Sequence, residues 1–149
     1  MHIRAILNIE TGVLKNILRP MPGQSRVSEI QADGLKDAFV IVEGTENEGV
    51  IDIPNKDEII KNAKMRLLKR DRDAALMSIV SVQGEDRYDA RPVDEQNLLA
   101  GIEMNQTKWF DADNKVIDTD ATVLEAVLTD GKEQAKVIWD SFMEEASNI

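Results

Sequence analysis

The stretch from Ile79 to Leu128 decides the fold, and it reads IVSVQGEDRYDARPVDEQNLLAGIEMNQTKWFDADNKVIDTDATVLEAVL. β-Branched residues at its start precede the turn-forming sequence Gly84-Glu85-Asp86, so residues 87–90 are predicted to return as a second strand. Pro92 then favours the start of a helix, because proline is tolerated in a first turn and not in a helix interior. The predicted helix has one apolar side, formed by Val93, Leu98, Leu99, Ile102 and Met104.

A second hairpin is predicted over residues 107–118, where two short runs of strand-forming residues flank the turn Asp111-Ala112-Asp113-Asn114. A helix is expected to follow from about Asp118 or Thr119. Gly131 leaves two alternatives open within that helix. Either Asp130-Gly131 breaks it in two, or the helix is continuous and Gly131 lets another backbone approach closely.

Residues 1–53 predict a four-stranded antiparallel sheet. Residues 3–20 form a hairpin around the turn Glu10-Thr11-Gly12, and residues 39–42 pair with residues 49–53 across a loop at Gly44–Glu48. After this sheet a helix is expected to run to about Met77, with Asn55 as its N-cap and Glu58 completing a variant of the capping box.

The sequence therefore predicts an α+β fold with three parts. They are an N-terminal β unit at residues 1–53, a connecting helix at 54–78, and a C-terminal domain at 79–149 in which two β-hairpins pack with two or three helices. The apolar positions of the connecting helix follow a spacing of three and four, interrupted by Arg70. That pattern fits either a coiled-coil seam that forms a homotrimer or a linker helix that packs on its own domain. These positions are Ile60, Ala63, Leu67, Ala74 and Met77.

Composition excludes several classes of protein. The 149 residues include no cysteine, and His2 is the one histidine, so disulfides, thiolate metal sites and histidine catalysis are not expected. The net charge is −10, and residues 73–149 hold 17 acidic side chains against 6 basic ones. Such a half is unsuited to nucleic acid, and suits a basic partner or serves solubility. No apolar run approaches a membrane span and no signal-peptide pattern opens the chain, so a cytoplasmic protein without a membrane partner is expected.

No motif predicts catalysis or a cofactor, since the glycines are isolated and neither a P-loop nor a nucleophile elbow is present. Residues 111–120 carry alternating oxygen ligands, as a calcium loop does. They depart from it at Lys115, Val116 and Thr122, the fifth, sixth and twelfth positions, so no metal is expected. A second acidic group is interpreted as turn and helix-start carboxylates: Glu85, Asp86, Asp89, Asp94 and Glu95.

The few large side chains are the candidates for contact with a partner, because tryptophan and tyrosine dominate interface energetics. Most of the aromatic residues, Trp139 and Phe142 among them, are expected in the core, and one or two are expected to anchor a partner. The candidate contact residues are Tyr88, Trp109, Phe110, Trp139 and Met143.

Several short motifs carry a resemblance to a known family. The motifs are IVSVQG at 79–84, RYDA at 87–90, EQNLL at 95–99, WFDADNKVI at 109–117, TDATVLEAV at 119–127, and KRDRDAAL at 69–76. They resemble an uncharacterised C-terminal domain of tailed-phage proteins encoded beside tail fibres. The segment ILNIETGVLKNIL at 6–18 is similar to the opening hairpin of many tail-fibre assembly and tail accessory proteins. Together the two resemblances cover roughly residues 3–20 and 64–147.

The resemblance implies a non-enzymatic accessory protein of the tail fibre or baseplate. Such a protein would act in fibre assembly, as a chaperone does, or as a virion component, through contacts with a fibre or baseplate protein. It would reside in the host cytoplasm during assembly or in the virion tail. The alternative hypothesis is an acidic phage inhibitor that mimics DNA to block a host defence protein. The acidic C-terminal half motivates that hypothesis, although Arg87, Arg91, Lys108 and Lys115 interrupt the acidic residues.

Overall fold

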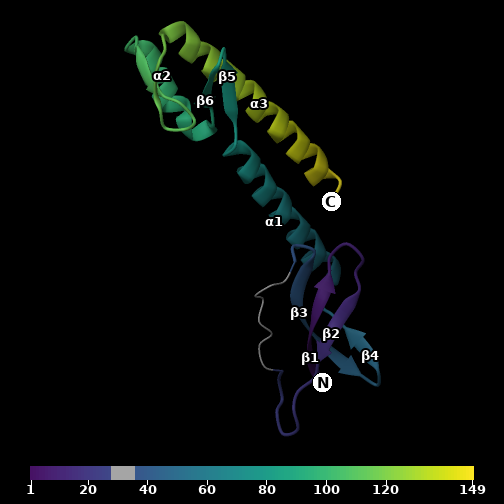
Figure 1. Ribbon diagram of the computed structural model, residues 1–149. Helices are drawn as coiled ribbons and strands as arrows, with labels where there is room; N and C mark the ends of the chain where they lie inside the picture. The colour runs from purple at the N-terminus through teal and green to yellow at the C-terminus, as the bar shows by residue number, and fades with distance from the viewer. Residues whose placement is uncertain (28–35) are drawn as a thin grey trace. The chain divides into compact units, whose positions relative to one another are not determined.

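A computed structural model describes residues 1–27 and 36–149, and the chain divides into two compact units, residues 1–67 and 68–148. The fold is α+β, as the sequence predicts, with an antiparallel N-terminal sheet, helices and two small hairpin sheets (Figure 1). Each unit has its own apolar core. The boundary between the units falls inside the predicted connecting helix and not at one of its ends.

The first unit is built on the predicted four-stranded antiparallel sheet, with strand order β2-β1-β3-β4. Ile3, Ala5 and Leu7 alternate along β1 and are fully buried, because alternate side chains of a strand point to the same face. They form the core of this unit together with Val42 and Ile53. The strands are β1 (His2–Asn8), β2 (Leu14–Leu18), β3 (Phe39–Asn47) and β4 (Val50–Asp52).

The loop predicted at Gly44–Glu48 is wrong, because β3 continues through that segment to Asn47. The backbone of Gly44 pairs with Ile3 of β1, and Thr45 pairs with both His2 of β1 and Asp52 of β4. The chain reverses only at Glu48 and Gly49, whose φ values are 51° and 80°. Pairing partners on two sides therefore keep this polar segment extended, against its low strand propensity.

Helix α1 (Lys56–Leu76) lies where the sequence predicts it. Asn55 directly precedes it, but with a φ of 58° instead of the extended backbone usual for an N-cap residue. Of the positions proposed as a coiled-coil seam, Ile60 packs against the core of the first unit and Ala63 is buried. Part of that seam is therefore used within the chain.

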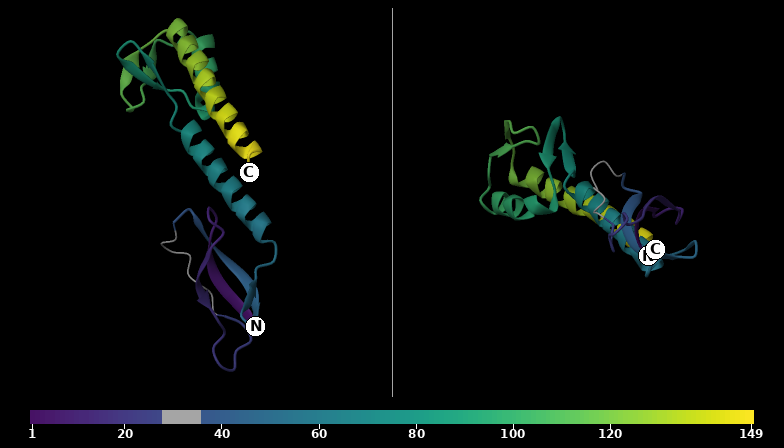
Figure 2. Two further views of the ribbon diagram at one scale, coloured as in Figure 1. Left: turned by 90° about the vertical axis from the view of Figure 1, so that its right-hand side faces the viewer. Right: turned by 90° about the horizontal axis from the view of Figure 1, so that it is seen from below.

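The second unit contains both predicted hairpins and both predicted helices. Figure 2 shows the hairpins and α2 gathered around the N-terminal half of α3. A 3-10 turn that begins at Pro92 leads into α2, as expected from the proline. The elements are β5 (Val80–Gln83), β6 (Asp86–Asp89), η1 (Pro92–Asp94), α2 (Glu95–Glu103), β7 (Lys108–Phe110), β8 (Val116–Asp118) and α3 (Ala121–Ser147).

The apolar side predicted for α2 is only partly correct. Leu98 is fully buried and Ile102 packs against the core beside it, whereas Val93, Leu99 and Met104 are 47–67% exposed. The face of α2 that meets the core is set by Leu98, Gly101 and Ile102, which share one side at a spacing of three and four. The buried cluster of the unit comprises Leu76, Ile79, Tyr88, Ala90, Leu98, Leu124 and Val127.

Helix α3 is continuous through Gly131, which resolves the alternatives left open by the sequence. Asp120 caps its start by accepting a hydrogen bond of 2.9 Å from the Val123 amide. A Cβ added at Gly131 would lie 2.5 Å from the Ala90 carbonyl oxygen and 3.0 Å from the Ala90 Cβ. The glycine therefore lets the backbone that leaves β6 pack directly on the helix.

Among the described residues, no helix has both the length and the apolar character needed to cross a bilayer.

We predict that Gly131→Ala destabilises the second unit by about 1–2 kcal/mol, because its Cβ would overlap backbone that cannot rotate away. Helix propensity alone predicts the opposite, a gain of about 1 kcal/mol. Urea unfolding followed by tryptophan fluorescence is the appropriate measurement, since both tryptophans, Trp109 and Trp139, lie in this unit. The matched control is Glu133→Ala at an exposed position of the same helix, which is expected to be near neutral. A more stable Gly131→Ala variant would contradict the close contact.

Candidate functional site

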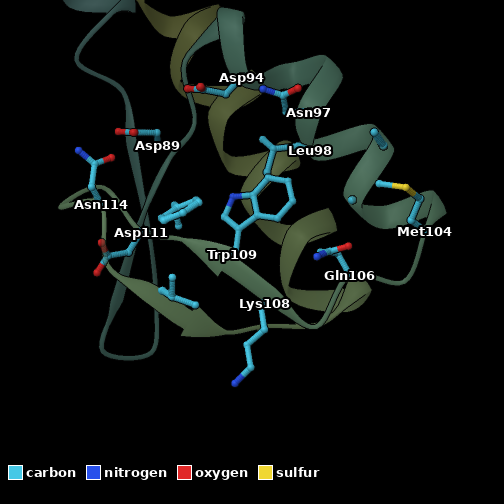
Figure 3. A pocket seen from close by; sticks show the side chains of 14 residues that line it. Asp89, Asp94, Asn97, Leu98, Met104, Gln106, Lys108, Trp109, Asp111 and Asn114 are labelled. Atoms are coloured by element: carbon cyan, nitrogen blue, oxygen red, sulfur yellow. The ribbon is translucent and has the colours of Figure 1, made fainter.

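The candidate site is a hollow of about 590 Å³ in the second unit, between the β7–β8 hairpin, α2 and the end of β6 (Figure 3). Its lining combines apolar and polar side chains, as ligand and peptide sites do. Those residues are Asp89, Asp94, Asn97, Leu98, Ala100, Gly101, Met104, Gln106, Lys108, Trp109, Phe110, Asp111, Asn114 and Val116.

Backbone hydrogen bonds hold the β7–β8 hairpin against its neighbours. The Ala112 amide, in the hairpin turn, donates to the Arg87 carbonyl of β6 at 2.8 Å. On the other side, the Gln106 amide donates to the Gly101 carbonyl of α2 at 2.9 Å. A strand pair this short is marginal alone, so these bonds and side-chain packing set its position.

The strand alternation of the hairpin gives its two faces opposite roles. Trp109 pairs with Ile117, and both pack against the buried core. Phe110 pairs with Val116, and these two are 65% and 62% exposed. Neighbouring residues 109 and 110 therefore differ in role, since one is half-buried under the hairpin and the other is presented outward.

Gly101 allows Trp109 to lie directly on α2. A Cβ at Gly101 would stand 2.6 Å from Cζ3 of Trp109 and 3.0 Å from Cδ1 of Leu124. The indole therefore occupies the space that a larger residue at 101 would fill. Leu98, which is 1% exposed, lies beside it at the base of the hollow (Figure 3).

Asp94 stands on the rim of the hollow and organises the 3-10 turn η1 that leads into α2. Its carboxylate accepts hydrogen bonds from the Arg91 amide at 3.0 Å and from the Arg91 guanidinium at 2.8 and 3.0 Å. The guanidinium hydrogen bonds lower the pKa of Asp94 below its ordinary range, although partial burial opposes this shift. This carboxylate therefore has a structural role, since its hydrogen bonds are made to Arg91.

The other charged residues of the rim differ in the hydrogen bonds and ion pairs that they form within the protein. Oδ1 of Asp111 accepts hydrogen bonds from the Asp113 and Lys115 amides, at 2.9 and 2.8 Å, and so shapes the hairpin turn. Lys108 pairs with Asp118 across the two strands. The Asp89 side chain is 39% exposed, and its nearest ion-pair contact is Arg91 at 3.9 Å.

This lining offers apolar contact and hydrogen bonding. Among the described residues, those that line the hollow include no histidine and no hydroxyl side chain. Two of its three carboxylates are held by hydrogen bonds that the fold needs. Such a surface is suited to holding a large side chain of another molecule.

The structure separates the five contact residues predicted from sequence. Trp109 and Phe110 meet at the hollow, whereas Trp139 and Met143 lie on the C-terminal half of α3. Tyr88 belongs to the core, because it is 1% exposed and its hydroxyl lies 3.1 Å from the Thr119 hydroxyl. It is not available as a surface contact.

Trp139 and Phe142 form a second aromatic cluster, and the prediction that both are core residues is only partly correct. Their rings meet edge to face with centroids 5.8 Å apart, and the Arg72 guanidinium lies 4.7 Å from each ring centroid. Trp139 is nevertheless 41% exposed and Met143 is 59% exposed. Arg72 of α1 therefore packs on both rings of this cluster.

Sequence reasoning missed Met104, Val116 and Asp89 as parts of the site. Val116 could have been found, because a hairpin centred on residues 111–115 places it opposite Phe110 on the outward face. Met104 was assigned to the buried side of α2, and Asp89 was interpreted only as a turn carboxylate. Their meeting at one hollow depends on tertiary packing.

Two of the carboxylates in the calcium-like segment at 111–120 have structural roles. Asp111 uses one carboxylate oxygen for backbone amides, and Asp120 caps α3. Within residues 1–27 and 36–149, no group of three or more histidine or carboxylate side chains is placed to hold a metal ion.

Comparisons of this chain with known protein families, with curated proteins and with solved structures found no match.

We predict that Trp109→Ala and Phe110→Ala have very different effects on stability. Trp109→Ala removes a ring that packs on Gly101 and the core, and should cost about 2–3 kcal/mol. Phe110→Ala removes an outward side chain and should change the free energy of unfolding by less than about 0.5 kcal/mol. Urea unfolding by far-ultraviolet circular dichroism measures both. Equal losses would show that the hairpin faces are assigned wrongly.

We also predict a pH dependence that arises from Asp94. Because its folded pKa is lowered, its stabilisation is complete above the unfolded pKa of about 3.9 and is lost as the pH falls through the lower folded value. Asp94→Asn should cost about 1 kcal/mol at neutral pH, by loss of the helix-start bonds. The deficit should shrink in acid.

Urea unfolding at neutral pH and in acid, followed by tryptophan fluorescence, tests this prediction. The control is Glu144→Gln, at an exposed position of α3. A deficit for Asp94→Asn that persists unchanged in acid would assign the effect to side-chain shape and not to charge.

Proposed function

We propose that this protein is a non-enzymatic accessory protein of a tailed-phage tail fibre or baseplate. It would act in fibre assembly or as a structural tail component, through protein–protein contact. The single observation that carries the proposal is the hollow beside β7–β8, where exposed Phe110, Val116 and Met104 surround a half-buried Trp109. Clustered exposed apolar side chains around an aromatic anchor are typical of interaction sites.

The resemblance to the phage domain supplies the biological setting of the proposal. The motifs that carry it fall within residues 69–127, inside the compact unit of residues 68–148. They therefore describe a unit with its own core, and the RYDA and WFDADNKVI motifs bracket the hollow. A binding unit of this kind is compatible with an assembly factor and with a virion part.

The DNA-mimic alternative draws support from charge alone, since residues 68–148 contain 18 acidic and 9 basic side chains. Ion pairs within this unit weaken that support. Four ion pairs place cations among the carboxylates. These pairs are Arg91 with Asp94, Lys108 with Asp118, Lys132 with Glu95 and Lys136 with Asp140. Phosphate mimicry requires rows of uninterrupted negative charge, so the contact function is favoured.

The proposal predicts that the protein copurifies with a C-terminal fragment of a tail-fibre protein when the two are coexpressed. Phe110→Ala should weaken that association about tenfold or more, as truncation of a central aromatic anchor does. Val137→Ala is the matched control, because Val137 is 68% exposed but lies on the C-terminal half of α3, outside the hollow.

No association at any salt concentration, with fibre and baseplate fragments alike, would count against the function. An association that neither variant changes would keep the function and remove the hollow as its site. Light scattering on the purified protein separates the two forms of the proposal. A stable trimer suits a part of a three-fold fibre, whereas a monomer suits an assembly factor.

A further inference from the structure

We infer that the hollow binds a partner segment in which one bulky apolar side chain is flanked by lysine or arginine. This inference rests on the proposed function and specifies the chemistry of its partner. The observations behind it are the apolar base of the hollow, the uneven placement of charge around its rim, and the acidity of the whole unit.

The base of the hollow favours an apolar side chain of the bound partner. Leu98 is 1% exposed, and Trp109 is held over Gly101 with its indole ring against the hollow. Phe110 and Met104, which are 65% and 67% exposed, would lose contact with water when a large side chain enters. A volume of about 590 Å³ falls in the range of sites that bury such groups.

The three carboxylates of the rim lie on one side of the hollow. In Figure 3, Asp94, Asp89 and Asp111 lie along one side of the Trp109 ring, and Met104 and Gln106 lie on the opposite side. Lys108 is the one basic residue of the lining, and it pairs with Asp118. A bound segment would therefore place its cation at the acidic edge and its apolar part toward Met104.

Asp89 is the residue most able to receive that cation. Its side chain is 39% exposed and its contact with Arg91 is long, at 3.9 Å, whereas Asp94 and Asp111 are engaged by hydrogen bonds. Arginine would suit this edge best, because its planar fork can bridge a carboxylate and stack on an aromatic ring. The neighbouring carboxylates raise the local cation preference without needing direct contact.

The same charges disfavour two other occupants. A nucleic acid would bring phosphates against three carboxylates. A second copy of this surface would oppose acid to acid, in a unit with twice as many acidic as basic residues. A segment of a different protein that carries basic and apolar side chains would not be repelled by these carboxylates.

Selection of short peptides from a random library against the whole protein tests the inference without knowledge of the partner. The enriched peptides should carry a bulky apolar residue next to lysine or arginine. A selected peptide, measured by calorimetry, should bind Phe110→Ala about tenfold more weakly. It should bind Asp89→Asn about two- to fivefold more weakly at low salt, with a smaller difference at high salt.

The control variants are Val137→Ala and Glu144→Gln, an exposed apolar and an exposed acidic residue of α3 outside the hollow. They should bind the peptide as the wild type does. Enriched peptides without basic residues, or peptides that bind Phe110→Ala and Asp89→Asn normally, would overturn the inference.

These outcomes are separable from those of the proposed function. Basic apolar peptides that bind the hollow while no fibre or baseplate fragment does would leave the inference standing and reject the phage setting. A fibre fragment that associates equally with wild type and both hollow variants would reject the inference and leave the phage setting standing.

Discussion

The second unit depends on two close contacts with its helices that glycines allow, one made by backbone and the other by an aromatic ring. At Gly131 the chain leaving β6 lies against α3, and at Gly101 the Trp109 ring lies against α2. With ordinary side chains at these positions, both hairpins would stand further from the helices, and Leu98, Leu124 and Val127 would lose their dense packing. The hollow forms because the Trp109 side chain packs against the core, whereas the side chain of its neighbour Phe110 is exposed to solvent.

Most of the charged groups near the hollow serve the fold first. Asp94 holds the 3-10 turn before α2 and Asp111 shapes the hairpin turn, so the acidic character of this surface is partly a by-product of helix-start and turn chemistry. The same carboxylates still project a negative potential. A basic partner of the kind proposed above would meet one further carboxylate at this surface, Asp89, whose side chain is 39% exposed.

Much of the secondary structure could be predicted because its signals are local. The turns near Gly84 and Asp111, Pro92 at a helix start, and the alternation of residues 3–7 each act over a few residues. Errors arose where the outcome depends on pairing or packing. The segment from Gly44 to Asn47 is a strand because β1 and β4 both hydrogen-bond to it. Its residue types by themselves do not indicate a strand.

The sequence by itself determined the α+β class, both hairpins, the helix positions and the acidic balance, because these follow from propensity, turn chemistry and charge count. The tertiary structure decided which large side chains are accessible. Tyr88 and Phe110 are similar rings near similar turns, yet one is 1% and the other 65% exposed. The physical reason is that burial depends on what packs across a face. Tyr88 packs in one cluster with Leu124 and Val127 of α3, which are distant in sequence, whereas Phe110 lies on the outward face of its hairpin.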